Sequence, residues 1–327
     1  MSYYNLTFAG CKNTTLECMK AVLDMGAKID LLITISPDTA KKNMVAGYHD
    51  LRHFAEENKI RTYVTGSYSL KSETDIKNLN ENDFNLMLVI GWQRLIPEWL
   101  LSKLKIGAFG MHGSSRSLPY GRGRSPMNWS IIQNKNMFIT NLFRYNKDVD
   151  AGEVIDSVIF DINPFDTAQT LHYKNTLAMI KILRNNLHNM LENKLHLKPQ
   201  LNIEPSYYPK RTAEDGIIFW DRDTVEIYNL IRAVTRPFHG AFTFHEDKKI
   251  MIWKAFPFDT RLFDPEIEPG TVLETFLNGD FVVKTGSDTL IITDYETIGF
   301  DKIEKGMKFN NSTYFYHCPF DFPSHLT

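Results

Sequence analysis

The chain has 327 residues, of which 43% are hydrophobic and 23% charged, as in an ordinary globular protein with about two domains. Its formal net charge of −2 gives no global reason to expect a nucleic-acid partner. The sequence has no CxxC pair, no basic leader and no apolar run approaching about 18 residues. We therefore expect a cytoplasmic protein without a membrane span.

Strand-like and helix-like segments alternate through the first half of the chain. Helical patterns follow Gly10, run from an N-cap at Asp50 through Asn58, precede Leu86, and cover Pro97–Leu104. Five apolar runs predict strands: Leu6–Ala9, Ile29–Ile35, Thr62–Thr65, Leu86–Ile90 and Ala108–Met111. The alternation predicts an α/β fold with an open, mostly parallel sheet and helices on both faces.

The second half changes character after a long helix that begins at Asp166 or Thr167. Residues 195–211 contain three prolines and little periodicity, so we interpret them as a linker. A helix over Thr224–Val234 precedes short strand-like runs at Ala241–Phe244, Ile250–Ala255, Thr271–Phe276, Phe281–Lys284 and Thr289–Ile292. We expect two domains, residues 1–200 and residues 201–327, the second a small β-barrel-like domain.

One histidine lies in the stretch FGMHGSSRSLPYGRGRSPMNW (109–129), at the end of the strand predicted over Ala108–Met111. Sites in open α/β sheets occur at the carboxyl ends of the strands, so His112 is a candidate catalytic residue. Asp150, in DVDAGEV after the strand predicted over Asn141–Tyr145, is its candidate partner. The alternatives are a structural hydrogen bond for His112 and a turn role for Asp150.

The blocks HGS…LP…GRGRSPMNW, TNLFRYNKDVDAGEVIDS and TAQTLHYK resemble the N10-formyltetrahydrofolate-dependent formyltransferase family. Downstream, KRTAEDGIIFW and IRAVTRPFHGAFTF are similar to the C-terminal, OB-type domain of its tRNA and sugar-nucleotide members, and closest to the sugar branch. The resemblance implies a Rossmann-like catalytic domain that binds N10-formyltetrahydrofolate as cosubstrate, without a metal.

In the resembled family, the catalytic trio is Asn, His and Asp, with the first two in an Asn-x-His arrangement. His112 matches the histidine and Asp150 the aspartate, but Gly110 stands where the family has Asn. The lost carboxamide would stabilise a developing oxyanion, and such a donor is worth roughly 100–1000-fold in rate. Either another donor replaces it (a backbone N–H, a water or a side chain such as Asn128), or the protein is slow or inactive.

The resemblance also implies two sets of binding residues. The folate set is Trp92, Arg94, Leu95, Ile96 and Val149, although several of these would serve equally well as core residues. The acceptor set follows His112 in the loop: Gly113, Ser114, Tyr120, Arg122, Arg124 and Asn128. Its arginines could hold a diphosphate bidentately or remain solvated.

The function implied is transfer of a formyl group to the amine of a nucleotide-linked amino sugar, such as a dTDP-sugar, in lipopolysaccharide or other surface-glycan biosynthesis. Two alternatives stay open: a methionyl-tRNA formyltransferase, which would need a basic face on the second domain, and a non-catalytic binding homologue, because of Gly110. The expected partners are folate and the nucleotide sugar, with neither nucleic acid nor membrane. The second domain is a candidate contact for a homodimer.

Overall fold

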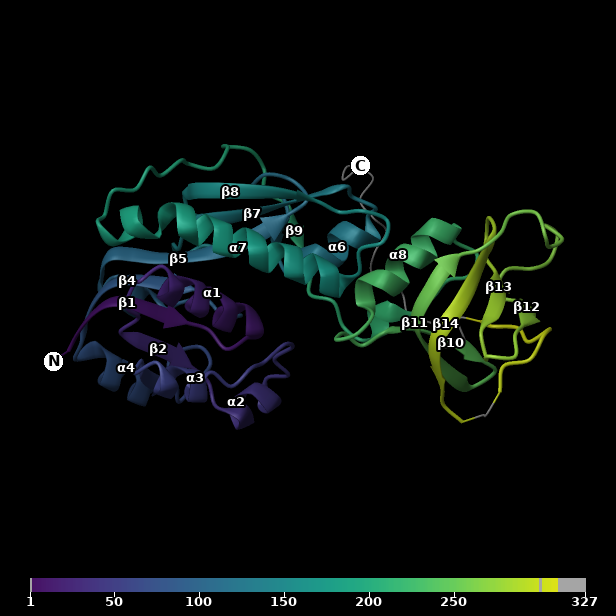
Figure 1. Cartoon of the computed structure of the whole chain (residues 1–327), viewed down its shortest axis with the longest axis horizontal. Helices are drawn as coiled ribbons and strands as arrows, with labels where there is room; N and C mark the ends of the chain where they lie inside the picture. The colour runs from purple at the N-terminus through teal and green to yellow at the C-terminus, as the bar shows by residue number, and fades with distance from the viewer. Residues whose placement is uncertain (1, 300–301, 311–327) are drawn as a thin grey trace. The chain divides into compact units, whose positions relative to one another are not determined.

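The structure is a computed structural model that describes residues 2–299 and 302–310. It divides into two compact units (Figure 1). The first comprises Met1–Ile131 and Lys135–Arg211, and the second comprises Ile132–Asn134 and the chain from Thr212 onward. Residues 201–211, which we expected to open the second domain, therefore belong to the first unit.

A seven-stranded sheet forms the centre of the first unit, in the order β3-β2-β1-β4-β5-β7-β8. Pairing is parallel from β3 to β5, whereas β7 and β8 are antiparallel to their neighbours. All four residues of β2 are apolar or Thr and buried, as expected for a strand covered on both faces. The strands are β1 (Tyr3–Ala9), β2 (Leu31–Thr34), β3 (Arg61–Val64), β4 (Asp83–Val89), β5 (Leu104–Ser114), β7 (Met137–Arg144) and β8 (Val154–Asp161).

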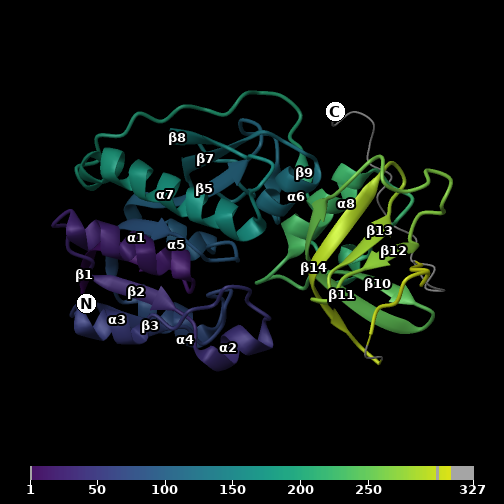
Figure 2. The same ribbon diagram turned by 45° about the vertical axis from the view of Figure 1, so that its right-hand side comes forward.

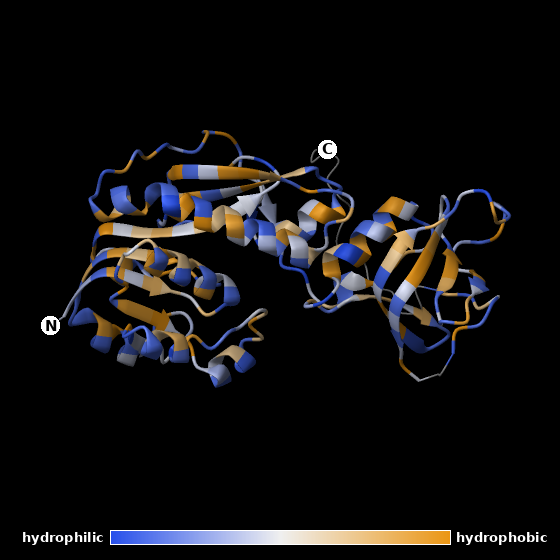
Figure 3. Cartoon of the chain, viewed as in Figure 1, coloured by the Kyte–Doolittle hydropathy of each residue, from blue (hydrophilic) through white to orange (hydrophobic). Residues whose placement is uncertain are grey.

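Helices cover both faces of this sheet, which confirms the predicted fold class. One core cluster joins Phe8 of β1 to Met19 of α1 and Leu183 of α7, while the next residue of β1, Ala9, faces a second cluster with Leu100 of α5. This alternation follows from the two-residue period of a strand. The helices are α1 (Asn13–Asp24), α2 (Pro37–Lys42), α3 (Arg52–Glu57), α4 (Glu73–Asn80), α5 (Glu98–Leu101), α6 (Pro126–Ile132) and α7 (Ala168–Leu191). Figure 3 shows apolar residues concentrated in the strands and mixed along helices such as α7.

Three helices differ from the sequence expectation. Ser36-Pro37, expected only to stop a strand, starts α2, because the Ser36 hydroxyl accepts from Thr39 N and proline fits the first turn. Leu51, not Asp50, is the N-cap of α3, although Asp50 Oδ1 accepts from Arg52 N at 3.2 Å. The helix expected over Pro97–Leu104 is shortened to α5, because the chain from Leu104 onward pairs as β5.

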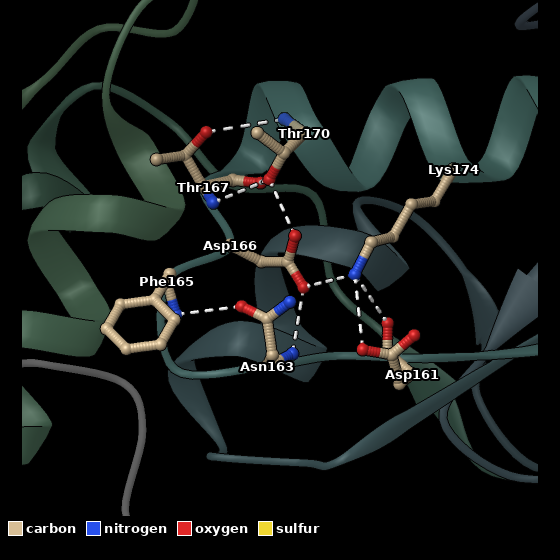
Figure 4. A network of polar contacts seen from close by, with 7 residues as sticks. All are labelled: Asp161, Asn163, Phe165, Asp166, Thr167, Thr170 and Lys174. Atoms are coloured by element: carbon tan, nitrogen blue, oxygen red, sulfur yellow. Dashed lines mark hydrogen bonds and ion pairs between the residues drawn. The ribbon is translucent and has the colours of Figure 1, made fainter.

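Polar contacts fix the start of α7 (Figure 4). Thr167 is the N-cap, and the Thr167 and Thr170 side chains each accept a hydrogen bond from the other residue's backbone N–H. The preceding Asp166 is 4% exposed. Its carboxylate accepts from Lys174 Nζ at 2.7 Å, from Thr170 Oγ1 and from Asn163 N. Asp166, just before α7, is thereby bonded to the first turn of the helix at Thr170 and to the second turn at Lys174.

The second unit carries a five-stranded antiparallel sheet in the order β10-β11-β14-β13-β12. Isolated bridges join Phe244 to Asn310 and Thr271 to Lys308, so one segment pairs near both edge strands, as a barrel-like closure requires. Figure 2 shows the strands curving around one another beside α8. The helices and strands of the second unit are η1 (Glu214–Gly216), α8 (Thr224–Val234), β10 (Ala241–His245), β11 (Lys248–Pro257), β12 (Val272–Thr275), β13 (Phe281–Lys284) and β14 (Thr289–Thr297).

Candidate active site

His112 lies on β5, the strand at which the sheet changes from parallel to antiparallel pairing. β5 pairs with β4 as far as Gly110 and with β7 as far as Ser114. The expectation that His112 follows a strand ending at Met111 is therefore corrected: His112 is inside the strand, opposite Asn141, because pairing with β7 lengthens β5. It still lies beyond the last residue paired with β4, at the carboxyl edge of the parallel strands.

Asp150 faces the imidazole ring of His112. Nδ1 of the ring lies 3.4 Å from Oδ2 of Asp150, and the two side chains are 9% and 17% exposed. The other ring nitrogen, Nε2, lies 2.8 Å from the main-chain oxygen of Gly121. Because a carbonyl and a carboxylate can only accept, a ring with N–H groups on both nitrogens is the form that donates to both. Both ring nitrogens of His112 thus face oxygen acceptors.

The turn that carries Asp150 is held at several points. Asp150 has a φ of +50°, a left-handed conformation that Asp tolerates better than most residues. Its Oδ2 accepts from Gly123 N at 3.1 Å. The Gln200 amide donates to the main-chain oxygens of both Asp150 and Gly152, each at 2.8 Å. These contacts orient the carboxylate independently of His112.

The segment expected to be a linker is part of the site's scaffold. β6 (Arg122–Gly123) pairs in parallel with β9 (Tyr207–Tyr208), which lies in that segment. Ser206 adds a hydroxyl that accepts from Gly121 N at 2.8 Å. The carbonyl that meets the His112 ring is therefore fixed by a residue 85 positions away in sequence.

Tyr145 occupies the space beside Gly110. A Cβ added to Gly110 would overlap Cε2 of the Tyr145 ring and would lie 3.0 Å from its hydroxyl oxygen. The ring also stacks on Phe143, with centroids 5.4 Å apart. Burial, and to a smaller degree the nearby charge of Asp150, raise the pKa of the Tyr145 phenol, so it stays protonated near neutral pH.

Of the residues expected to bind folate, Trp92 and Arg94 lie against the same tyrosine, Tyr68. Trp92 and Ile96 are buried, and Trp92 packs edge-on against Tyr68 with centroids 4.8 Å apart. The Arg94 guanidinium lies 4.8 Å from the same tyrosine ring and donates to Asn43. Trp92 Nε1 is buried without a hydrogen-bond partner among the residues that the structure describes.

Leu95 and Val149 are exposed, at 50% and 39%. Val149 follows a segment that lines a surface hollow of about 490 Å³ together with α5. The hollow's lining residues are Glu98, Leu101, Ser102, Tyr145, Asn146, Lys147 and Asp148. Because Tyr145 also touches the Gly110 position, one ring joins this hollow to the β5 strand that carries His112.

The residues expected to bind the acceptor differ in access. Gly113, Ser114 and Asn128 are buried in the first unit. Arg122 is only 9% exposed, and its guanidinium donates to Gln200 Oε1 at 2.6 Å and to the Tyr207 hydroxyl. It therefore braces the loop.

Tyr120 and Arg124 are the members of the acceptor set that stay partly open, since both are half-buried. Tyr120 lies under the exposed Arg116, whose Cζ is 3.8 Å from the ring centroid. A stacked, partly exposed pair of this kind offers both a cation and a ring face to a ligand.

A further cation, Lys12, lies just after β1 at the same edge of the sheet. The pKa of Lys12 is lowered to about 8, mainly by burial and to a smaller degree by repulsion from Arg124, while Cys11 opposes the shift. Burial and the charge of Lys12 also lower the pKa of His172, on α7, to about 4. Lys12 and Arg124 together make this edge electropositive, as an anionic ligand would require.

Sequence reasoning missed Tyr145, Gln200 and Lys12. For Lys12 a signal existed, because it follows the first strand directly, at a strand end where ligands bind. Tyr145 and Gln200 carry no such signal, since strand register and loop path bring them to the site.

Family models of known proteins match both parts of the chain. A family model described as "Formyl transferase" matches residues 9–185, and one described as "Formyl transferase, C-terminal domain" matches residues 210–311. The chain belongs to the formyl transferase family. This formyltransferase thus carries the family's two domains in the usual order, as its sequence motifs implied.

Solved structures of similar fold include two sugar enzymes. WlaRD, a sugar 3N-formyl transferase solved with dTDP and 5-N-formyl-THF, has a TM-score of 0.64 at 20% identity, over 90% of this chain and 98% of WlaRD. The N-formyltransferase from Helicobacter canadensis, solved with folinic acid and dTDP-3-aminofucose, has a TM-score of 0.63 at 21% identity, over 89% of this chain and 99% of that one.

HypX from Aquifex aeolicus, solved with tetrahydrofolic acid, has a TM-score of 0.61 at 18% identity, over 89% of this formyltransferase but only 44% of HypX. At these identities the likeness concerns the fold. Within the described parts of the chain, no cluster of His, Cys, Asp and Glu could hold a metal ion, and no helix is both long and apolar enough to cross a membrane.

Proposed function

We propose that this formyltransferase moves a formyl group from N10-formyltetrahydrofolate to the amine of a nucleotide-linked amino sugar. The observation that carries the proposal is the contact between His112 and Asp150 at the carboxyl edge of the sheet, 3.4 Å apart and shielded from water. The sugar acceptor is supported by the two solved sugar enzymes of similar fold, whose chains are matched over nearly their whole length.

The residues present fit a folate. A pterin is a flat ring with donors and acceptors along its edge, and such a ring needs both an apolar slot and polar partners. The hollow of about 490 Å³ beside α5 provides space, and residues 146–148 lie along its wall. Trp92 Nε1, outside the lining of that hollow, is a buried donor with no partner among the described residues.

His112 and Asp150 manage the proton in this proposal. The formylated folate supplies an activated formyl carbon bonded to N10. As the amine bonds to that carbon, negative charge grows on the formyl oxygen and the amine becomes acidic. In the proposed step, Nε2–H of His112 turns from the Gly121 oxygen, 2.8 Å away, to the formyl oxygen, while Asp150 stays at Nδ1, balances the imidazolium and orients it. The proton lost by the amine passes through this pair or water to N10 as the carbon–N10 bond breaks.

The acceptor is proposed to carry a diphosphate. Lys12 and Arg124 lie close enough for their charges to repel, and neither cation forms an ion pair with a carboxylate of the described residues. An anion would relieve that repulsion, and arginine suits phosphate oxygens geometrically. We propose a dTDP-linked sugar of surface-glycan biosynthesis, as both solved sugar enzymes were crystallised with dTDP or a dTDP-sugar.

The test is an acceptor panel with wild type, His112→Ala and Asp150→Asn. dTDP- and UDP-linked amino sugars and methionyl-tRNA are each supplied with N10-formyltetrahydrofolate. We expect wild type to formylate a dTDP-amino sugar, and both variants to lose at least about 100-fold in kcat. Transfer to methionyl-tRNA alone would contradict the acceptor. Calorimetric binding of folate and sugar without any turnover by the wild type would contradict the enzyme assignment.

A further inference from the structure

The register between β5 and β7 places an aromatic ring where a side chain of residue 110 would begin. Gly110 lies opposite Phe143, and Tyr145 N donates to Ala108 O at 2.8 Å just beyond the strand. The packing leaves no room for a Cβ at position 110, because Tyr145 Cζ would lie 2.9 Å from it. The Tyr145 side chain therefore replaces whatever a larger residue 110 would present.

Tyr145 lies on the same face of the sheet as His112. Side chains two residues apart on a strand point to the same face, so position 110 and His112 share one face of β5. Ala108 and Tyr145 belong to one core cluster, whereas Phe109 belongs to the cluster on the opposite face. The phenol is also close enough to Asp150 for the carboxylate charge to act on it.

The Tyr145 hydroxyl is a donor without an internal partner. Within residues 2–299 and 302–310 the structure gives this hydroxyl no hydrogen bond, although the ring is tightly packed by Phe143 and Gly110. Tyr145 is half-buried and lines the surface hollow beside α5, so its unpaired hydroxyl is open to a ligand there. A hydroxyl whose ring is packed against Gly110, which is left unpaired and which lies within the influence of the Asp150 charge, is suited to bind a ligand atom.

We propose that the Tyr145 hydroxyl is the catalytic donor to the formyl oxygen, in the place left by the glycine at position 110. The inference rests on the proposed function. When the amine nitrogen bonds to the formyl carbon, the carbonyl π pair moves to oxygen, and the Tyr145 O–H hydrogen-bonds to that oxygen without giving up its proton. When the carbon–N10 bond breaks, the pair returns to form C=O, and the amine proton reaches N10 through His112 and Asp150.

The hollow beside α5 agrees with this placement. Tyr145 lines it together with Leu101 and residues 146–148. The single ring then serves two purposes, since it forms one wall of the hollow and carries the donor that the reaction needs.

The test compares Tyr145→Phe with the wild type and with Tyr4→Phe. Tyr145→Phe keeps the ring and its stacking but removes the hydroxyl, so we expect kcat to fall roughly 100–1000-fold with the KM values and folate affinity little changed. Tyr4 is a buried tyrosine of the same core cluster, and its hydroxyl accepts from Arg61 at 2.8 Å. Because Tyr4 lies toward the amino end of β1, its variant should keep wild-type kcat.

A rescue separates a catalytic donor from mere packing. Gly110→Asn alone should be inactive, because the new side chain overlaps the Tyr145 ring. Tyr145→Ala alone removes the donor. The double variant Gly110→Asn/Tyr145→Ala restores both room and a donor, and should exceed each single variant at least about tenfold in kcat. A double variant no more active than Tyr145→Ala would overturn the shared role.

The outcomes distinguish this inference from the proposed function. Full activity of Tyr145→Phe, alongside loss in His112→Ala and Asp150→Asn, would overturn only the tyrosine assignment. Absence of transfer by the wild type to every acceptor would overturn both. If Tyr145→Phe does not fold, the double variant decides, because its donor sits on β5.

Discussion

The side-chain amide of Gln200 donates to the main-chain oxygen of Asp150 at 2.8 Å. The same side chain accepts from the buried Arg122 at 2.6 Å through its oxygen. One neutral residue thus joins the loop that follows His112 to the turn that presents the carboxylate. The relative positions of His112 and Asp150 therefore depend on a segment that shows no periodicity in the sequence.

The substitution Gln200→Ala should loosen the turn that carries Asp150, and we do not expect Gln200 itself to contact the substrate. We expect kcat to fall by up to about 100-fold, because small displacements of a catalytic group are costly, while KM values change little. Steady-state kinetics checks this, with Gln169→Ala on the exposed face of α7 as the control. Unchanged kcat in Gln200→Ala would show that the turn holds its shape without the clamp.

Arg122 and Arg124 should respond differently although they are neighbours in sequence. Arg122→Gln removes a buried cation that braces Gln200 and Tyr207, and should cost about 1–3 kcal/mol in the free energy of unfolding. Arg124→Gln should leave stability nearly unchanged and raise the acceptor KM. Denaturant unfolding and kinetics on both variants check this. A stable Arg122→Gln with a raised acceptor KM would restore the diphosphate role expected for Arg122.

Lys12 should make acceptor binding depend on pH. Its pKa is lowered to about 8, so it loses its charge as the pH rises through that value. The acceptor KM should therefore rise above about pH 8, and Lys12→Met should show a raised KM without this pH dependence. Lys20→Met, on the exposed side of α1, is the matched control. A wild-type KM that stays flat to about pH 9.5, where the amine would be largely neutral, would contradict a role for the Lys12 charge.

Asp166 should contribute to stability in a pH-dependent way. Burial acts to raise its pKa, but Lys174 and the hydrogen bonds from Asn163 and Thr170 outweigh burial and lower it. A lowered carboxyl pKa stabilises the fold above the unfolded value of about 4, and this contribution is lost as the pH falls through the folded value.

The variant Asp166→Asn should therefore cost about 1–3 kcal/mol at neutral pH and reduce the acid sensitivity of unfolding. Asp161→Asn is the control, because it removes the exposed partner of the same lysine (Figure 4), and exposed pairs are worth less than about 1 kcal/mol. Equal loss of stability in the two variants would contradict the special role of the buried carboxylate.

The local patterns of the sequence were enough to predict the architecture. Apolar runs such as the one around Leu31–Thr34 predicted a sheet buried on both faces, and the helix over Thr224–Val234 was predicted with its observed bounds. These signals are local because burial periodicity is written into neighbouring residues. The motif around His112 and Asp150 likewise identified the family from the sequence.

The sequence by itself thus determined the order of the elements, the family and the pair of residues expected to handle the proton. Only the tertiary structure decided that β5 continues through His112, that Arg122 bonds to Gln200, that β9 pairs with the loop after His112, and that Tyr145 fills the space beside Gly110. Each of these depends on strand register or on contacts between residues far apart in the chain. Such contacts leave no periodic trace in the sequence, because they are set when distant segments pack together.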